Sequence, residues 1–370
     1  MKKITHAELE ATTYHYAKNK RTMIVLGRTG IGKSYAVKQT AKRLAKDEKK
    51  EFVEWNNTTE KQRVEILSNP DKHYLFVDLR LTQMAPEDLK GLPTMDKDMV
   101  VWKPNAWAYF ANKCSSTIFF DEINLAPPSL QATTYQILLD RQIGEIPLGD
   151  NVFIAGAGNL TEDRAGVYEL PKPVRTRAGV YELVCPTAEQ LTSFAIKNEW
   201  DSRVVSYINA FPSRIFVENE KVDDVICPRG YEFVSGLIKP IDNDNLDAIQ
   251  LYSSGILGEA GGIEFSAFIK LFGKIPTPEA ILSKKAKIPD DTQLKYACVS
   301  AITEYFRQQK EKDKLEVIKK IIALKPVLDA EFHILLLRMC NAVNGENILL
   351  KLLGTEHSKL IMEYSVYLKE

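Results

Sequence analysis

Residues 22–34 read Thr-Met-Ile-Val-Leu-Gly-Arg-Thr-Gly-Ile-Gly-Lys-Ser. The first five form a compact apolar run, as expected of a buried parallel strand. The next eight match the pattern G-x-x-x-x-G-K-[ST], and the residues after them predict an amphipathic helix over about 33–46. A strand, a glycine-rich loop and a helix in this order predict a phosphate-binding unit, because the backbone N–H groups of such a loop surround phosphates.

The pattern of this loop predicts which of its residues contact a nucleotide. Lys33 is expected to reach the β and γ phosphates of a bound nucleotide, and Ser34 to hold Mg²⁺. The glycines allow the backbone to turn its N–H groups inward. The predicted nucleotide contacts are Gly27, Arg28, Thr29, Gly30, Ile31, Gly32, Lys33, Ser34 and Tyr35.

Apolar runs alternate with helical patterns through the first half of the chain. Strands are predicted at residues 52–55, 74–78, 116–121 and 152–155, and helices at 7–18, 58–67 and 129–139. This alternation predicts an α/β fold, with an open, mostly parallel sheet covered by helices on both faces. Residues 91–104 interrupt the pattern and are predicted to form an inserted hairpin. Residues 142–151 interrupt it again and are predicted to form a second short hairpin or an extended loop.

Helical spacing replaces the strands after about residue 186, and no further strand is expected. We expect an α/β nucleotide-binding core over 1–185, a helical lid over 186–260 and an all-α C-terminal extension over 261–370. In the extension, residues 293–310 and 330–343 are expected to form helices whose apolar stripes are typical of core packing.

The composition of the chain argues against several classes of protein. The chain has 370 residues, with 49 basic and 49 acidic side chains. Zero net charge argues against a protein that coats nucleic acid, because phosphate binding needs surplus Lys and Arg. Five scattered cysteines without a C-x-x-C pair indicate reduced thiols, and the dispersed histidines suggest no metal site. Since no signal peptide and no bilayer-spanning stretch is recognisable, we expect a soluble, cytoplasmic protein.

Two adjacent acids end an apolar strand at Asp121 and Glu122. In a phosphate-binding sheet, Asp121 would bind Mg²⁺ through its water shell, and Glu122 would orient and polarise the attacking water. The alternative is an ordinary solvated strand end. Kinases and GTPases seldom need the second acid, and the guanine-reading pattern N-K-x-D is absent, so the sequence favours hydrolysis of ATP over GTP.

Polar residues downstream complete the candidate site. Asn159 ends the next apolar strand, where an amide can hydrogen-bond both the γ phosphate and the water, although such residues are usually part of turns. Arg175 and Arg177 follow a predicted helix start, and Arg229 lies at the start of another predicted helix. A lone arginine is most often a surface charge, but a shared active site needs a cation that stabilises the transition-state phosphate.

The order of the motifs G-R-T-G-I-G-K-S, F-F-D-E-I-N-L-A-P-P, A-G-A-G-N, P-V-R-T-R and C-P-R-G-Y-E-F resembles the MoxR branch of the AAA+ ATPases. The resemblance covers about residues 21–237. Residues 121–127 are similar to the D-E-I-N-R-A-P signature of that family, with Leu125 where arginine is common. Residues 78–93 are similar to its linker into the helix-2 insert.

The resemblance implies a role for each matching position. Lys33 and Ser34 match the Walker A pair, Asp121 and Glu122 match Walker B, and Asn159 matches sensor 1. The two hairpins match the helix-2 and pre-sensor-1 inserts of the family.

Three arginines also match. Arg177 best matches the arginine finger, which acts on ATP bound by the neighbouring subunit. Arg175 is a near competitor, because the usual Arg-Phe pair is here Arg177-Ala178. Arg229 matches the sensor 2 arginine of the lid.

The family implies a hexameric ring that remodels a protein, often beside a partner with a von Willebrand factor A domain.

One alternative is a nucleic-acid motor or loader on the same core. Lysines lie in or near the first insert, and Trp102 and Trp107 could stack on bases. Acidic residues are interleaved with these lysines, which argues against this alternative. Another is a nucleotide-gated scaffold with slow turnover, against which the intact Glu122 counts. The lysines are Lys90, Lys97, Lys103 and Lys113.

Overall fold

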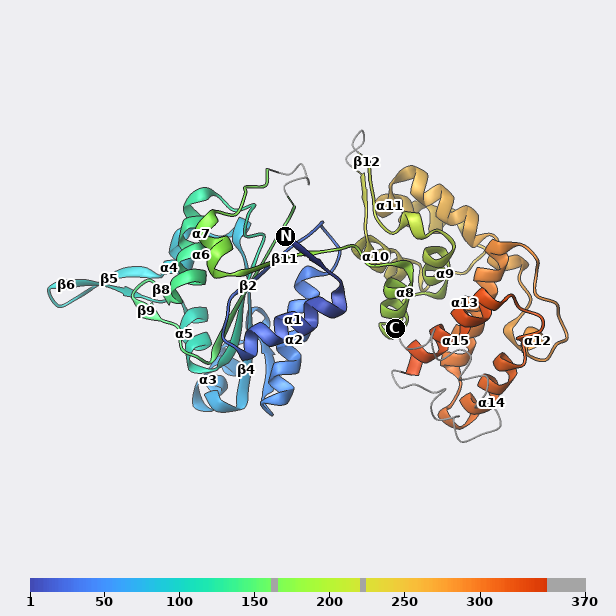
Figure 1. Cartoon of the computed structure of the whole chain (residues 1–370), viewed down its shortest axis with the longest axis horizontal. Coiled ribbons are helices and arrows are strands. Elements are labelled where there is room, and N and C mark those ends of the chain that lie inside the picture. The colour runs from blue at the N-terminus through green and yellow to red at the C-terminus, as the bar shows by residue number, and fades with distance from the viewer. Residues whose placement is uncertain (161–165, 220–223, 345–370) are drawn as a thin grey trace. The chain divides into compact units, whose positions relative to one another are not determined.

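The computed structural model describes residues 1–160, 166–219 and 224–344 (Figure 1). The chain divides into two units, Met1–Cys185 and Pro186–Glu370. Each unit contains a hydrophobic core of its own. None of the helices in these three ranges has the length and apolarity needed to cross a bilayer.

The first unit is built on a seven-stranded parallel sheet in the order β1-β11-β2-β10-β7-β4-β3. Its strands are β1 (Lys2–Ile4), β2 (Met23–Leu26), β3 (Glu51–Glu54), β4 (His73–Arg80), β7 (Ser115–Asp121), β10 (Val152–Gly158) and β11 (Gly179–Leu183). The central strands β2, β7 and β10 are buried along their length except at Asp121. Continuous burial is typical of strands covered on both faces, and the predicted α/β class is confirmed.

Helices flank this sheet. They are α1 (His6–Lys18), α2 (Lys33–Asp47), α3 (Glu60–Ser68), α4 (Pro86–Lys90), α5 (Ala106–Lys113), α6 (Pro128–Asp140) and α7 (Lys172–Arg177). Figure 1 shows α1 and α2 on one side of the sheet and α5, α6 and α7 on the other. Single 3₁₀ turns lie at Trp55–Asn57, Pro70–Lys72 and Leu81–Gln83 in this unit, and at Pro212–Arg214 and Phe272–Lys274 in the second.

Both predicted insertions form hairpins. The first pairs β5 (Leu92–Asp96) with β6 (Met99–Lys103), and Figure 1 shows it projecting from the α/β unit. The second pairs β8 (Gln142–Ile143) with β9 (Ile146–Pro147). A Cβ added at Gly144, in the second turn, would lie 3.6 Å from Cβ of Trp102. The turn of the second hairpin therefore lies against the base of the first.

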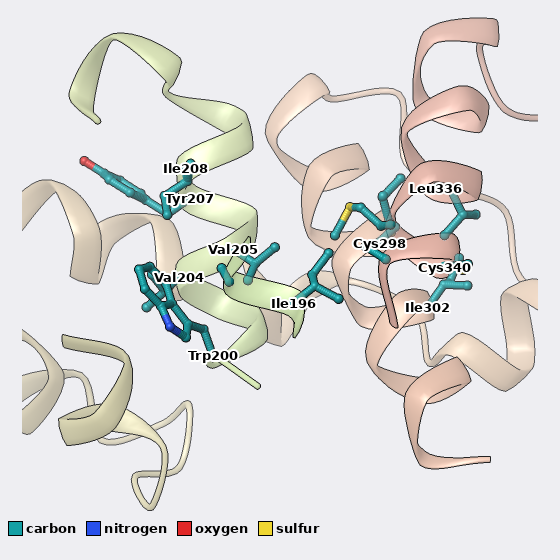
Figure 2. Close-up of a cluster of buried hydrophobic side chains, with 14 of the residues drawn as sticks. Ile196, Trp200, Val204, Val205, Tyr207, Ile208, Cys298, Ile302, Leu336 and Cys340 are labelled. Atoms are coloured by element: carbon teal, nitrogen blue, oxygen red, sulfur yellow. The ribbon is translucent and has the colours of Figure 1, made fainter. Parts of the chain in front are cut away.

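The second unit is largely helical, with α8 (Ala188–Lys197), α9 (Ser202–Ala210), α10 (Pro228–Ile238), α11 (Leu246–Ile269), α12 (Pro278–Leu282), α13 (Thr292–Gln308), α14 (Glu311–Ile322) and α15 (Ala330–Asn344). Its apolar side chains form one cluster (Figure 2). Val205 of α9, Ile302 of α13 and Leu336 of α15 all belong to it. The residues expected to form the lid therefore share a core with those expected to form the extension, and the division at 260 remains a proposal.

The expectation that no strand follows residue 186 was wrong. β12 (Val217–Asn219) and β13 (Asp224–Ile226) form an antiparallel hairpin in the second unit. Strands of three residues are too short for an alternating pattern to distinguish them from a loop.

Candidate nucleotide-binding site

The phosphate-binding loop connects β2 to α2. Gly30 and Gly32 have φ angles of 75° and 98°, in the left-handed region that glycine adopts readily. Gly32 caps α2, so the first N–H groups of that helix and the positive end of its dipole face the loop. This confirms the predicted order of strand, loop and helix, and it creates a place for an anion.

Lys33 lies inside the loop with 8% of its surface exposed. Its ammonium donates to the carbonyl oxygens of Gly27 at 2.6 Å and Arg28 at 2.8 Å, and to Oδ1 of Asn159 at 3.0 Å. The structure therefore brings together the lysine and the amide that the sequence singled out separately.

Ser34 and Asp121 also meet. The Ser34 hydroxyl donates to Oδ2 of Asp121 at 2.9 Å. A hydroxyl and a carboxylate are the oxygen ligands that Mg²⁺ prefers, and Mg²⁺ usually completes its coordination with water and phosphate oxygens. Within the described ranges no group of three or more His, Cys, Asp or Glu side chains could hold a metal by itself. The oxygen atoms of Ser34 and Asp121 fit an Mg²⁺ ion that also binds phosphate oxygens.

Glu122 follows β7 in a left-handed conformation, with φ at 58°, which is uncommon for a residue other than glycine. Its N–H donates to Oδ1 of Asp121 at 2.9 Å, and its carboxylate accepts a hydrogen bond from the hydroxyl of Thr82. Thr82 follows β4, whose Arg80 lies opposite Asp121 in the parallel register. Sequence reasoning missed Thr82, because its proximity depends on that register.

Asn159 is held by a second amide. Nδ2 of Asn124 donates to the Asn159 carbonyl at 2.8 Å, and the Asn159 N–H donates to Oδ1 of Asn124 at 2.9 Å. Asn124 is 1% exposed. Because both backbone groups of Asn159 are fixed, its side chain is directed toward Lys33. The only sequence signal for Asn124 was its place in the D-E-I-N stretch.

A further acid lies at this edge of the sheet. Burial, reinforced by the nearby charge of Asp121, raises the pKa of Asp78 to about 6, while Arg80 and Lys38 lower it less. Asp78 was not among the predicted site residues. Asp78 is partly buried near the carboxyl end of β4, and water therefore stabilises its charged form less.

The candidate arginines lie on two further helices, α7 and α10. Arg175 and Arg177 are exposed in the last turn of α7. Nη1 of Arg177 lies 3.7 Å from Oδ1 of Asp140, and Nε of Arg175 donates to the Leu170 carbonyl at 3.1 Å. Arg229 is exposed in the first turn of α10, in the second unit. Their roles stay predictions.

The base-stacking expectation for Trp107 was wrong. Trp107 is 7% exposed, and its indole N–H donates to the Asp88 carbonyl at 3.0 Å. A ring enclosed in the core offers no face to a nucleobase. Helix α5 instead directs this residue toward the sheet, where it packs in the apolar cluster of the first unit.

The first hairpin exposes apolar side chains. Leu92, Met95, Met99 and Val100 are 59%, 67%, 69% and 57% exposed. Met95 lies opposite Val100 in the antiparallel register, so the two side chains are neighbours on one face. This hairpin surface is a candidate for contact with another macromolecule.

Solved structures similar to this chain include three proteins of low identity. A mutant of RuvB from Thermotoga maritima is 14% identical, with 85% of this chain and 76% of that chain covered and a TM-score of 0.32. NtrX from Brucella abortus in complex with ADP is 15% identical, with 98% and 68% covered and a TM-score of 0.33. The ADP form of ORC2 from Aeropyrum pernix is 13% identical, with 92% and 93% covered and a TM-score of 0.37. Similarity at this level carries no information about function.

Sequence comparison gives a more specific result. No curated protein sequence matches the chain. Residues 22–161 match the family described as AAA domain (dynein-related subfamily). The match begins just before β2 and spans the loop, both acids and Asn159. The first unit of this chain therefore contains a region that is similar to the AAA domain of this family.

Proposed function

We propose that the chain is a Mg²⁺-dependent ATPase of the MoxR branch that assembles into a ring and remodels a protein partner. The observation that carries the proposal is the meeting of Lys33, Ser34, Asp121, Glu122 and Asn159 at the ends of β2, β7 and β10. These strands are neighbours in a parallel sheet, and ligands of such sheets bind at the carboxyl ends of the strands.

Each residue has a distinct task in hydrolysis. Lys33 and the N–H groups of the loop bind the β and γ phosphates. Ser34 and Asp121 would hold Mg²⁺, which when bound offsets negative charge on the phosphates. Glu122 orients the attacking water and accepts its proton, and Asn159 fixes the position of the γ phosphate and of that water.

The arginines support a shared site. In this proposal Arg177, or alternatively Arg175, acts as a finger on ATP bound by the neighbouring subunit. The Arg177 side chain is 61% exposed, as such a role requires. Arg229 acts as the sensor 2 residue of the lid. A hexamer with fingers and sites at each subunit boundary is the assembly we propose.

The hairpin surface favours a protein as the partner. Flexible methionines beside Leu92 and Val100 adapt to varied protein surfaces. A nucleic-acid motor is the second candidate, but the buried Trp107 and the acids Asp96 and Asp98 give it less support. The resemblance alone suggests that the partner contains a von Willebrand factor A domain.

A pull-down with Glu122→Gln, in the presence and absence of ATP, tests this function. We expect a protein that is enriched only with ATP. Replacing Met95 and Val100 with serine should abolish its capture. Replacing Val64 and Leu67 of α3, which are also exposed, should not.

Two results would contradict the proposal. Capture that survives the hairpin substitutions would exclude this surface as the docking site. Recovery of nucleic acid without a specific protein would make the motor or loader the better account.

A further inference from the structure

The segment before α1 reaches the phosphate-binding loop. Ile4 of β1 pairs with Leu183 of β11, and Thr5 caps α1 in a reciprocal capping box with Glu8. These two anchors hold His6, the first residue of α1, against the loop. Its Nε2 lies 2.5 Å from the carbonyl oxygen of Ile31. A Cβ added at Gly32 would lie 3.3 Å from the same ring nitrogen.

The contact with Ile31 determines which nitrogen carries the proton. A carbonyl oxygen only accepts hydrogen bonds, so Nε2 must be the donor, and in a neutral ring Nδ1 is then a bare acceptor. Nδ1 of His6 is buried and has no hydrogen-bond partner among the residues that the structure describes. Buried polar atoms without a partner are rare, because leaving one unpaired costs stability.

The chemistry of a nucleotide indicates which part of it could supply the missing donor. The triphosphate at neutral pH offers acceptor oxygens, which cannot pair with a bare Nδ1. The donors of ATP all belong to its nucleoside, as the amino group of adenine and the hydroxyls of ribose. Guanine has a carbonyl oxygen where adenine has the amino group, so contact with the base would also discriminate between the two.

We propose that His6 is a nucleoside-binding residue of this site, whose Nε2–H holds the Ile31 carbonyl while Nδ1 accepts a hydrogen bond from adenine or ribose. The inference rests on the proposed binding of ATP at this loop. His6 thereby joins two tasks: it positions the loop beside Gly32, and it contacts the part of the ligand that the loop itself does not reach.

Binding measurements on three variants separate these tasks. His6→Phe keeps a flat ring against Gly32 and removes both nitrogens, while His6→Gln retains one donor and one acceptor. His15→Ala is the matched control, since His15 is an exposed histidine of the same helix. Dissociation constants are measured with Mg²⁺ for ATP, GTP, 2′-deoxy-ATP, 3′-deoxy-ATP and inorganic tripolyphosphate, and the thermal unfolding of each variant is recorded.

We expect His6→Phe to weaken ATP binding about tenfold more than tripolyphosphate binding, the size of one hydrogen bond. His6→Gln should recover part of this loss, and His15→Ala should change nothing. If adenine is the donor, the preference for ATP over GTP falls in His6→Phe. If ribose is the donor, the preference for ATP over one deoxy nucleotide falls instead.

Other results of the same measurements would contradict the proposal. Equal weakening of ATP and tripolyphosphate, or no weakening of either, would overturn the nucleoside contact. Failure of the proposed function would give a different result from failure of the His6 contact. The wild type would then not bind ATP, or Lys33→Ala would leave its binding of ATP unchanged.

Discussion

The hydroxyl of Thr82 donates a hydrogen bond to the carboxylate of Glu122. The two residues are 40 positions apart and meet because β4 and β7 are adjacent strands that end at the same edge. A carboxylate oxygen held in this way is less available to a water molecule. In our account the contact restrains hydrolysis until Glu122 is released.

Replacement of Thr82 with valine should raise the basal turnover of ATP. A hydrogen bond to a charged group contributes about 1.5–3 kcal/mol, so its loss should increase the rate about tenfold or more if the bond must break before hydrolysis. Phosphate release under saturating ATP measures this. Ser68→Ala removes an exposed hydroxyl elsewhere in the unit and serves as the control. An unchanged rate in Thr82→Val would exclude this restraint, and a lower rate would mean that the contact supports catalysis.

The finger assignment can be tested by mixing subunits. Arg177→Ala, or Arg175→Ala if that residue is the finger, should lower turnover by about 10³–10⁵ while nucleotide binding persists. Each of these variants is mixed with Lys33→Ala, which has no functional loop of its own. Activity should return in the mixture, since the Lys33→Ala subunit can still supply its arginine. Full activity of both arginine variants alone would contradict a finger at either position.

Asn124→Ala should destabilise the first unit. The substitution leaves the partly buried N–H and carbonyl of Asn159 without the side chain that holds them, which costs about 1–3 kcal/mol. Turnover should also fall, because the Asn159 side chain loses its fixed orientation. Urea unfolding and phosphate release measure the two effects. Asn57→Ala, at an exposed position, should alter neither.

Asp78 should make stability depend on pH. Its pKa rises from an ordinary 3.8 to about 6 on folding, so between these values the folded state binds more protons than the unfolded state. Stability therefore falls as pH rises from about 4 to 6. The free energy of unfolding of Asp78→Asn should fall less over this pH range than that of the wild type. The difference should be about 1 kcal/mol after allowance for solvent screening. Urea unfolding of the wild type and of Asp78→Asn, in the presence of EDTA, measures the free energy of unfolding at each pH. Parallel pH profiles of the two proteins would exclude a contribution from Asp78.

The sequence predicted those parts of the site that depend on local pattern. Lys33, Ser34, Asp121 and Asn159 each belong to a short motif at a strand end, and parallel strands bring such ends together. Strands with long apolar runs, such as β7 and β10, were also predictable.

The missed features depend on distant parts of the chain. Thr82, Asn124 and His6 make their contacts through strand register and helix placement. These depend on residues far apart in the chain and cannot be recognised in any short stretch of one sequence. The short strands β1 and β11 were missed for a related reason. They are three and five residues long, and they belong to the sheet only through their pairing with each other and with β2.

Phosphate release from ATP by the wild type and by Glu122→Gln, together with the affinity of each for ATP, tests the central claim most directly. We predict Mg²⁺-dependent hydrolysis by the wild type. The variant should bind ATP with similar affinity and turn over about 10²–10⁴ times more slowly, because it lacks the base that accepts the proton of the water. Hydrolysis by Glu122→Gln at the wild-type rate would contradict the account.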